Sequence, residues 1–329
     1  MRNDGGTTRP ALRLLSWRGI WGRALLEAVI EPFARETGIR VEPRFHVGLT
    51  LPDPLDCDVV WSNAVPALRM AAADACLPLT ERELPSLASL HPRAKPLASG
   101  RGWPIVCPYA VHYVLGYRRE AFAGRKPDSW AVMLEPRFRG KLALYPGGNG
   151  LHPIAQVMGG GRLDDIPEAM EPCWNFVGAL RPQVGGLDYS IGMEERIRRR
   201  ELDLFFRALP NALAFQQAGL DVDWAAPKEG IADTLDALWI PKNIAEERLA
   251  AAKKFIDFAL SAPVLQNWCA KLGALPLNLQ AAPSGLFGQA SGLPTGPDDF
   301  QGILHIPEQV KLHQERAWQN RFERIFSSA

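Results

Sequence analysis

Three carboxylates stand in a short, mostly apolar stretch, APKEGIADTLDALWIPKN at residues 226–243. They belong to Glu229, Asp233 and Asp236. A carboxylate among buried side chains is costly unless donors or a cation compensate its charge. The pattern therefore favours internal partners for these acids or a bound cationic group. Capping of a turn or helix is the ordinary structural role for Asp236.

Aromatic and cationic residues stand where predicted strands end. Trp17 and Arg18 follow the apolar run 11–17, and Arg207 follows the apolar run 202–206. An exposed tryptophan offers contact area and a cation–π surface, although a core position is the common alternative. An arginine grips a carboxylate or phosphate with two parallel hydrogen bonds. A surface salt bridge is the ordinary alternative for Arg18.

Further candidates surround the same predicted strand ends. Trp61 and Ser62 precede a helix predicted at 64–75, whose first amide groups favour an anion or a carbonyl. Tyr109 and Tyr113 offer aromatic walls within a long strand predicted at 103–117. Tyr145 opens the glycine-rich turn YPGGNG, where backbone amides are able to bind a polar group.

Known catalytic and metal-binding patterns are absent from the sequence. It contains no nucleophile elbow, no HExxH, no phosphate-binding loop and no clustered His/Asp set, so we expect no catalytic residue, metal or cofactor. The five cysteines are scattered without CxxC spacing. We expect that folding needs no disulfide and that at least one thiol is free. A Cys57–Cys76 bridge is the conceivable exception.

Charge and hydropathy exclude two classes of partner. The 329 residues carry a formal net charge of +1, which provides no global field for nucleic acid. The basic run Arg196–Arg200 is typical of a solvated helix face. No run of about 18 apolar residues is present, so no membrane span is predicted. The N-terminus lacks the apolar core of a secretory signal, which leaves open a cytosolic protein or a mature form without its leader.

Strand and helix signals alternate along the chain, which favours an α/β fold with mostly parallel sheets flanked by helices. A helix is predicted at 24–36 and ends at Gly38, and the tail at 307–325 reads as another helix with His313 facing inward. The strand at 103–117 is long enough to pass from one lobe to another. At this length two lobes are expected.

Several short motifs in this order resemble the extracellular solute-binding proteins of ABC importers, of the type that binds polyamines, iron or thiamine. The motifs are LLSW at 14–17, PFARETGIRV at 32–41, DVVW at 58–61, PDSW at 127–130, RGKLA at 139–143, PKEG at 227–230, IPKN at 240–243 and AKKFIDF at 252–258. The resemblance implies a two-lobed periplasmic-binding-protein-like fold of type II with crossed hinge strands. It also implies a ligand cleft between the lobes that closes by hinge motion.

Domain boundaries follow from the same resemblance. Lobe 1 is expected to comprise 11–108 plus 231–282, and lobe 2 to comprise 109–230. A C-terminal helical segment at 283–329 is expected to pack on the lobes. The resemblance further implies a small-molecule ligand, an ABC permease as partner, a periplasmic location and a monomer.

The family's amine-binding segment aligns with 227–241 without a gap. Its Asp falls on Asp236, while its Trp falls on Thr234, so the acid is kept and the aromatic group is lost. Arg18 and Arg207 add cations that would repel a polycation, because two unit charges about 4 Å apart interact by roughly 4 kcal/mol at an effective dielectric near 20. The expected ligand is therefore a small amine with an acidic group, and a polyamine is the alternative.

Two other functions stay open at this point. Thiamine-degrading enzymes share the architecture and use a cleft cysteine with a carboxylate base, roles for which Cys107 and Glu229 are the candidates. A cytosolic ligand sensor is the third possibility. The ferric binders of the resembled family commonly use adjacent tyrosines. None of the five tyrosines here are neighbours in sequence, so iron(III) is not an expected ligand.

Overall fold

The computed structural model describes residues 11–46, 51–52, 55–189, 192–288 and 291–327. The chain forms two compact units. Unit 1 consists of Met1–Pro108, Asp236–Trp268 and Asn278–Ala281, and unit 2 of Tyr109–Leu235, Cys269–Leu277 and Ala282–Ala329. Each unit is discontinuous in sequence. Among the described residues, no helix combines the length and apolarity that a membrane crossing requires.

Unit 1 is built on a sheet whose first three strands are parallel. The strand β1 (Leu12–Trp17) lies between β2 (Val41–His46) and β3 (Val59–Asn63), and residues 236–239 of β9 (Ile231–Trp239) pair antiparallel with β3. Because parallel strands end at the same edge of a sheet, the carboxyl ends of β1, β2 and β3 lie at one edge.

The first helix of unit 1 is continuous from residue 19 to residue 37 but contains a π turn. It comprises α1 (Gly19–Leu25), the π segment Leu26–Ile30 and α2 (Glu31–Thr37). Proline has no N–H and its ring clashes with the carbonyl four residues earlier, so Pro32 opens the helix locally. The backbone N–H of Glu31 accordingly donates to Leu26. Gly38, at φ 70°, ends the helix as predicted.

The remaining helices of unit 1 complete its core. They are α3 (Ala64–Ala72), α8 (Glu246–Leu260), most of α9 (Ala262–Leu272), and the 3-10 turns Pro85–Ser89 and Pro92–Ala94. Phe33 of α2 meets Phe255 of α8 edge to face, with ring centroids 5.2 Å apart. Trp61 of β3 packs on Trp268 of α9 at 5.1 Å.

Unit 2 is built around the long strand β4 (Val106–Arg118), which begins in unit 1. The strand β7 (Leu204–Ala208) pairs antiparallel with β4 and parallel with β5 (Leu142–Leu144), and β6 (Val184–Leu187) continues the sheet parallel to β5. β8 (Val222–Ala225) and β10 (Leu275–Pro276) pair antiparallel with β4. Tyr113 of β4 is opposite Ala208 at the end of β7, and Tyr117 is opposite Leu204 at its start. The end of β4 therefore lies beside the start of β7.

The helices of unit 2 are mostly short. They are α4 (His152–Met158), α5 (Glu171–Ala179), α6 (Met193–Arg198) and α7 (Leu209–Gln217), with 3-10 turns at Arg119–Phe122, Trp130–Leu134, Pro136–Phe138, Pro146–Gly148 and Leu163–Asp165. Each of α4, α5 and α7 carries proline in its first turn, where a missing N–H costs nothing.

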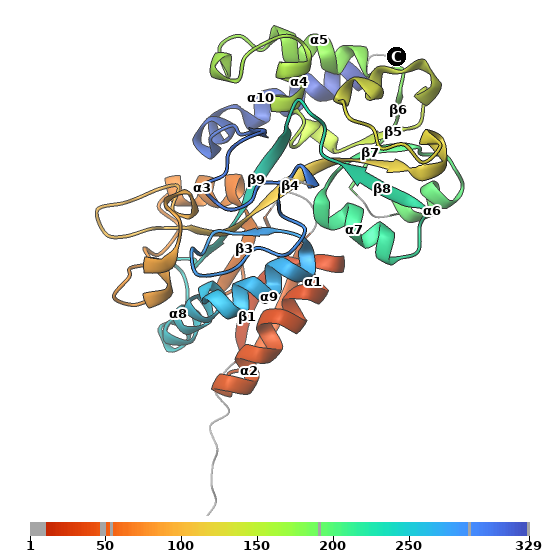
Figure 1. The fold of residues 1–329 in the computed structure, drawn as a ribbon. Coiled ribbons are helices and arrows are strands. Elements are labelled where there is room, and N and C mark those ends of the chain that lie inside the picture. Colours follow the sequence, from red (N-terminus) through yellow and green to blue (C-terminus); the bar gives the residue numbers. More distant parts are fainter. Residues whose placement is uncertain (1–10, 47–50, 53–54, 190–191, 289–290, 328–329) are drawn as a thin grey trace, which may run out of the picture. The chain divides into compact units, whose positions relative to one another are not determined.

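The C-terminal segment belongs to unit 2. Its strand β11 (Ile303–Leu304) pairs parallel with the start of β9, and α10 (Glu308–Ser327) runs alongside α5 and the turn Pro146–Gly148 (Figure 1). Trp318 and Phe322 are buried on this helix, as its sequence pattern predicted. His313 is exposed, so the expectation that it faces inward is wrong.

The strands β4 and β9 carry the chain from one unit to the other. Sequence placed these passages at 108/109 and 230/231, and the structure divides the chain at Pro108/Tyr109 and Leu235/Asp236. It also assigns residues 269–277 to unit 2, because β10 pairs with Tyr109 and Ala110 of β4. Residues 282–329 belong to the same unit.

Candidate functional site

The edge of the unit 1 sheet where β1, β2 and β3 end gathers several candidates. Trp17 ends β1 and Arg18 precedes α1, while Ser62 and Asn63 end β3. The antiparallel partner β9 brings Asp236 directly opposite Asn63. Residues predicted from three separate stretches of sequence therefore share one edge of one sheet.

Asp236 is a buried carboxylate at this edge. Its side chain accepts a hydrogen bond of 2.8 Å from Nδ2 of Asn63, and the residue is only 3% exposed. Since side chains alternate along a strand, Thr234 and Asp236 point to one face of β9 and Asp233 points to the other. Thr234 is half-buried. The two positions that the resemblance singled out thus share a strand face.

Asp233 and Glu229 have roles inside unit 2. Oδ1 of Asp233 lies 2.7 Å from Nδ1 of His305 in the C-terminal segment. Glu229 accepts hydrogen bonds from the hydroxyl of Ser129 and, at 3.2 Å, from the backbone N–H of Trp130, where a 3-10 turn begins. Each of the three acids in the stretch 226–243 therefore has an internal partner, and only Asp236 lies at the sheet edge.

Trp17 and Arg18 differ in exposure. Trp17 is half-buried and its ring lies 5.6 Å from that of Trp21, one turn into α1. Arg18 is exposed, and its guanidinium has no carboxylate partner in the described part of the chain. The indole of Trp17 and the guanidinium of Arg18 therefore belong to consecutive residues at the sheet edge where Asp236 also lies.

Trp61 lies in the core of unit 1. Its side chain is 0% exposed and packs against Trp268. The strand alternation that places Ser62 toward one side of the sheet places Trp61 toward the helix on the other. Ser62 is also buried, and its hydroxyl oxygen accepts a 3.4 Å hydrogen bond from the indole N–H of Trp239.

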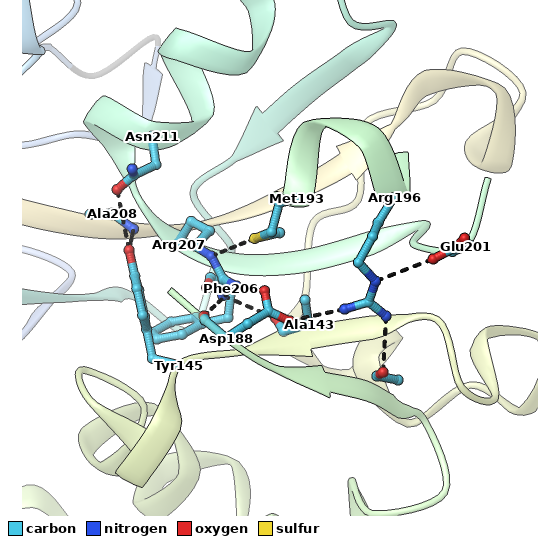
Figure 2. Close-up of polar contacts among 11 residues, drawn as sticks. Ala143, Tyr145, Asp188, Met193, Arg196, Glu201, Phe206, Arg207, Ala208 and Asn211 are labelled. Carbon is cyan, nitrogen blue, oxygen red and sulfur yellow. Dashed lines mark hydrogen bonds and ion pairs between the residues drawn. The ribbon is translucent and has the colours of Figure 1, made fainter. Parts of the chain in front are cut away.

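Arg207 is enclosed within unit 2 (Figure 2). Its Nε donates to the sulfur of Met193 at 3.0 Å. Its Nη1 donates to the carbonyl of Phe206 at 2.6 Å and to that of Ala143 at 3.4 Å. Its Nη2 donates to the backbone carbonyl of Asp188 at 2.8 Å and to its carboxylate at 3.5 Å. Burial lowers the pKa of this guanidinium. All five N–H donors have acceptors, so Arg207 acts as an internal brace instead of the expected second cation for a ligand.

Tyr145 lies against this brace. The guanidinium of Arg207 stands 4.5 Å from the centre of its ring, and its hydroxyl donates to Oδ1 of Asn211 at 3.2 Å. Tyr113 stacks on Phe206 at 5.2 Å and meets Tyr145 edge to face at 5.9 Å. These two rings are mostly buried, and Tyr109 is completely buried. Tyr113 and Tyr145 form an aromatic wall at the carboxyl ends of β5 and β7.

The glycine-rich turn after β5 has a packing role that sequence did not reveal. A Cβ on Gly148 would lie 2.7 Å from the Phe322 ring, and one on Gly147 would lie 2.8 Å from Gln319; both belong to α10. A Cβ on Gly150 would lie 2.5 Å from the ring of Tyr113. The glycines therefore let α10 and Tyr113 approach the turn closely.

The remaining sequence candidates have structural explanations. Cys107 is completely buried in β4, and Glu229 is occupied at a 3-10 turn, so neither is presented as a nucleophile or a base. The basic run at residues 196–200, which begins on α6 and extends past its end, is paired with carboxylates. Its pairs are Arg196–Asp188, Arg198–Glu194, Arg199–Glu195 and Arg200–Glu120. Among the described residues, no group of three or more His, Cys, Asp or Glu side chains is placed to hold a metal ion.

Asp188 is the polar residue of this region that sequence reasoning missed. It follows β6 and bridges two arginines, accepting from Nη2 of Arg207 and at 2.9 Å from Nη1 of Arg196. Its signal is the run VGGLD, in which an acid ends an apolar strand, the same pattern that identified the other candidates.

Comparison with known proteins assigns this architecture to a family. The family model described as bacterial extracellular solute-binding protein matches residues 48–295. The chain belongs to this family. No curated protein sequence matches the chain.

Solved structures match nearly the whole chain at low sequence identity. The Atu4243–GABA receptor is 20% identical, with a TM-score of 0.76 and coverage of 97% of this chain and 98% of that one. The periplasmic binding protein AfuA from Actinobacillus pleuropneumoniae, with fructose-6-phosphate bound, is 15% identical (TM-score 0.75; 97% and 99%). A putative spermidine/putrescine ABC transporter protein from Listeria monocytogenes is 18% identical (TM-score 0.71; 95% and 98%). These matches show the periplasmic-binding-protein fold.

Proposed function

We propose that this protein captures a small polar solute in the periplasm and delivers it to the permease of an ABC importer. Family membership supports capture of a solute. The discontinuous units joined by β4 and β9 support a hinged binding protein, because two linking strands allow closure around a ligand. No catalytic step is part of the proposal.

The proposed solute carries both an amine and an acidic group. The observation that supports this most is the edge of the unit 1 sheet, where Arg18 follows β1 with an exposed side chain, Asn63 ends the adjacent β3, and the buried carboxylate of Asp236 on β9 lies opposite Asn63. A carboxylate makes charge-assisted hydrogen bonds to an ammonium, and a guanidinium makes them to a carboxylate or phosphate. Trp17, which immediately precedes Arg18 at the end of β1, supplies an apolar surface at the same edge.

The solved relatives support a solute class that is wider than polyamines. They include a GABA receptor, a protein with fructose-6-phosphate bound and a putative spermidine/putrescine transporter protein, which together span zwitterions, anions and polycations. Residues at the site must therefore select the ligand. Because Arg207 is used internally, selection for the acidic group rests on Arg18 in this proposal.

A thermal-shift screen tests the proposal, because a ligand that binds the folded state raises the melting temperature by mass action. The compounds are amino acids and other zwitterions, polyamines, thiamine and sugar phosphates. We expect the largest shift with a zwitterion, and we expect Asp236→Asn and Arg18→Ala each to reduce it. Arg35→Ala is the matched control, since Arg35 is exposed at the other end of the same helix.

Two results would contradict the proposal. If no compound of any class shifts the wild-type protein, capture of a small polar solute is unsupported. If the best compound shifts Arg18→Ala, Asp236→Asn and Arg35→Ala as much as the wild type, the solute is bound elsewhere.

A further inference from the structure

A groove of about 560 Å³ lies on unit 2 and is lined by the segment from Glu120 to Arg137. This segment follows the end of β4, and the register of β4 with β7 places that end beside the start of β7, because Tyr117 is opposite Leu204. Tyr145 and Arg207 stand at the other edge of the same sheet, where β5 and β7 end. Within unit 2, the groove is thus separate from Tyr145 and Arg207.

The acids that line this groove already have cationic partners. Three carboxylates contribute to its wall, and each is paired. The pairs are Glu120 with Arg118 and Arg200 at 3.0 and 3.1 Å, Glu135 with Arg137 at 2.5 Å, and Asp128 with Lys228 at 3.8 Å. Their negative charge is therefore largely compensated before any ligand arrives.

Two cations of the same wall have no such compensation. Arg125 and Lys126 are adjacent and exposed, and neither has a carboxylate partner in the described part of the chain. The ammonium of Lys126 lies 5.0 Å from the centre of the Trp224 ring, which positions it without neutralising it. The groove consequently presents two unpaired positive charges side by side.

Aromatic and backbone contacts position Arg137 in the wall of the groove. Arg137 stacks on the rings of Phe122 and Phe138, with its guanidinium carbon 4.9 and 4.4 Å from their centres, and its Nη1 donates to the carbonyl of Ala121 at 2.9 Å. Phe122 is itself mostly buried. A third guanidinium is thereby fixed in the wall, only partly satisfied by Glu135.

We propose that this groove is a second ligand site, for a small organic anion with at least two negative charges. Its volume lies in the range of about 300–1,000 Å³ that small-molecule sites occupy. A single charge would leave one of the two adjacent cations unpaired, whereas a dicarboxylate or a phosphate compound pairs with both. The inference does not depend on which solute the protein captures.

Calorimetric titration with citrate and with inorganic pyrophosphate tests the inference. We expect the wild type to bind at least one of them, and Arg125→Gln/Lys126→Gln to bind it about tenfold or more weakly, equivalent to about 1.4 kcal/mol. The matched control is Arg181→Gln/Lys254→Gln, which removes the same charge at two exposed positions outside the groove. This control is expected to bind like the wild type.

A third variant tests the direction of the effect. Glu135→Gln removes the carboxylate that pairs with Arg137, so it is expected to bind the anion more tightly. The inference is overturned if the wild type binds neither anion, if the groove and control double variants bind equally, or if Glu135→Gln weakens binding. Circular dichroism of each variant establishes that it is folded.

Discussion

At the scale of single residues, two acids on one strand have different roles because side chains alternate. Asp236 lies at the edge of unit 1 beside Asn63, whereas Asp233 is bound to His305 on the other face of β9. Two arginines at strand ends differ in the same way. Arg18 is exposed, and Arg207 uses all its donors within unit 2. Residue type suggested chemistry for all four, and only the strand face and the neighbours separated their roles.

His152 provides a residue-scale prediction about pH. Its ring is buried between Trp174 and Trp318, with centroid distances of 5.4 and 5.1 Å, and its Nε2 has no hydrogen-bond partner among the described residues. Burial, with a smaller contribution from Lys311, lowers its pKa to about 4. Between that pKa and the unfolded value near 6.5, the unfolded chain binds more protons, so stability falls as the pH falls.

We therefore expect His152→Phe to lose less stability than the wild type when the pH is lowered from 7 to 4.5. The slopes of unfolding free energy against pH should differ between the two proteins by up to about 1.4 kcal/mol per pH unit, the value for one full proton. Urea denaturation across this range measures it, and the comparison cancels the acid sensitivity of carboxylates that both proteins share. Parallel stability curves for the two proteins would show that His152 does not contribute.

At the scale of elements, the C-terminal helix depends on a turn far away in sequence. Gly147 and Gly148 hold φ angles of 65° and 71° and leave room for Gln319 and Phe322 of α10. Both the left-handed backbone and the close contact require glycine at these positions. The turn Pro146–Gly148 therefore serves as the docking surface for α10.

Gly148→Ala should destabilise the protein more than Gly160→Ala. Both residues have positive φ, so both substitutions incur about 1–2 kcal/mol of backbone strain. Only at Gly148 would the added Cβ also meet a ring at 2.7 Å, because nothing lies within 4 Å at Gly160. We expect an extra loss of about 1–3 kcal/mol in unfolding free energy for Gly148→Ala. Equal losses for the two variants would mean that α10 does not rest on this turn.

Element positions were largely predictable, because local signals determine them. The apolar runs that became β1, β4 and β7, and the stop at Gly38, follow from periodicity and glycine geometry. The site was less predictable. The burial of Trp61 against Trp268 and the bracing of Arg207 by Asp188 depend on residues distant in sequence, which no local pattern encodes.

At the scale of the whole molecule, all five cysteines are buried as free thiols. The Cys57–Cys76 bridge, the one pairing that sequence left open, is not formed. Burial raises the pKa of Cys57, Cys76 and Cys173 to about 12, so these thiols stay protonated at neutral pH. The fold is held by its cores without disulfides.

The folded protein should consequently react very slowly with a thiol reagent, since the thiolate is the reactive form. In denaturant without reductant, five thiols per chain should react. Titration with a chromogenic disulfide reagent counts them in both states. A count of three or fewer in denaturant would reveal a disulfide and contradict the structure.

Two compounds of similar length test whether the solute pairs an amine with an acidic group. γ-Aminobutyrate and putrescine each carry an ammonium on a short alkyl chain, but one ends in a carboxylate and the other in a second ammonium. Calorimetric titration of the wild-type protein with both compounds compares their affinities. We expect tighter binding of γ-aminobutyrate, because Arg18 attracts the carboxylate and repels a second cation. Tighter binding of putrescine, unchanged in Arg18→Ala, would contradict it.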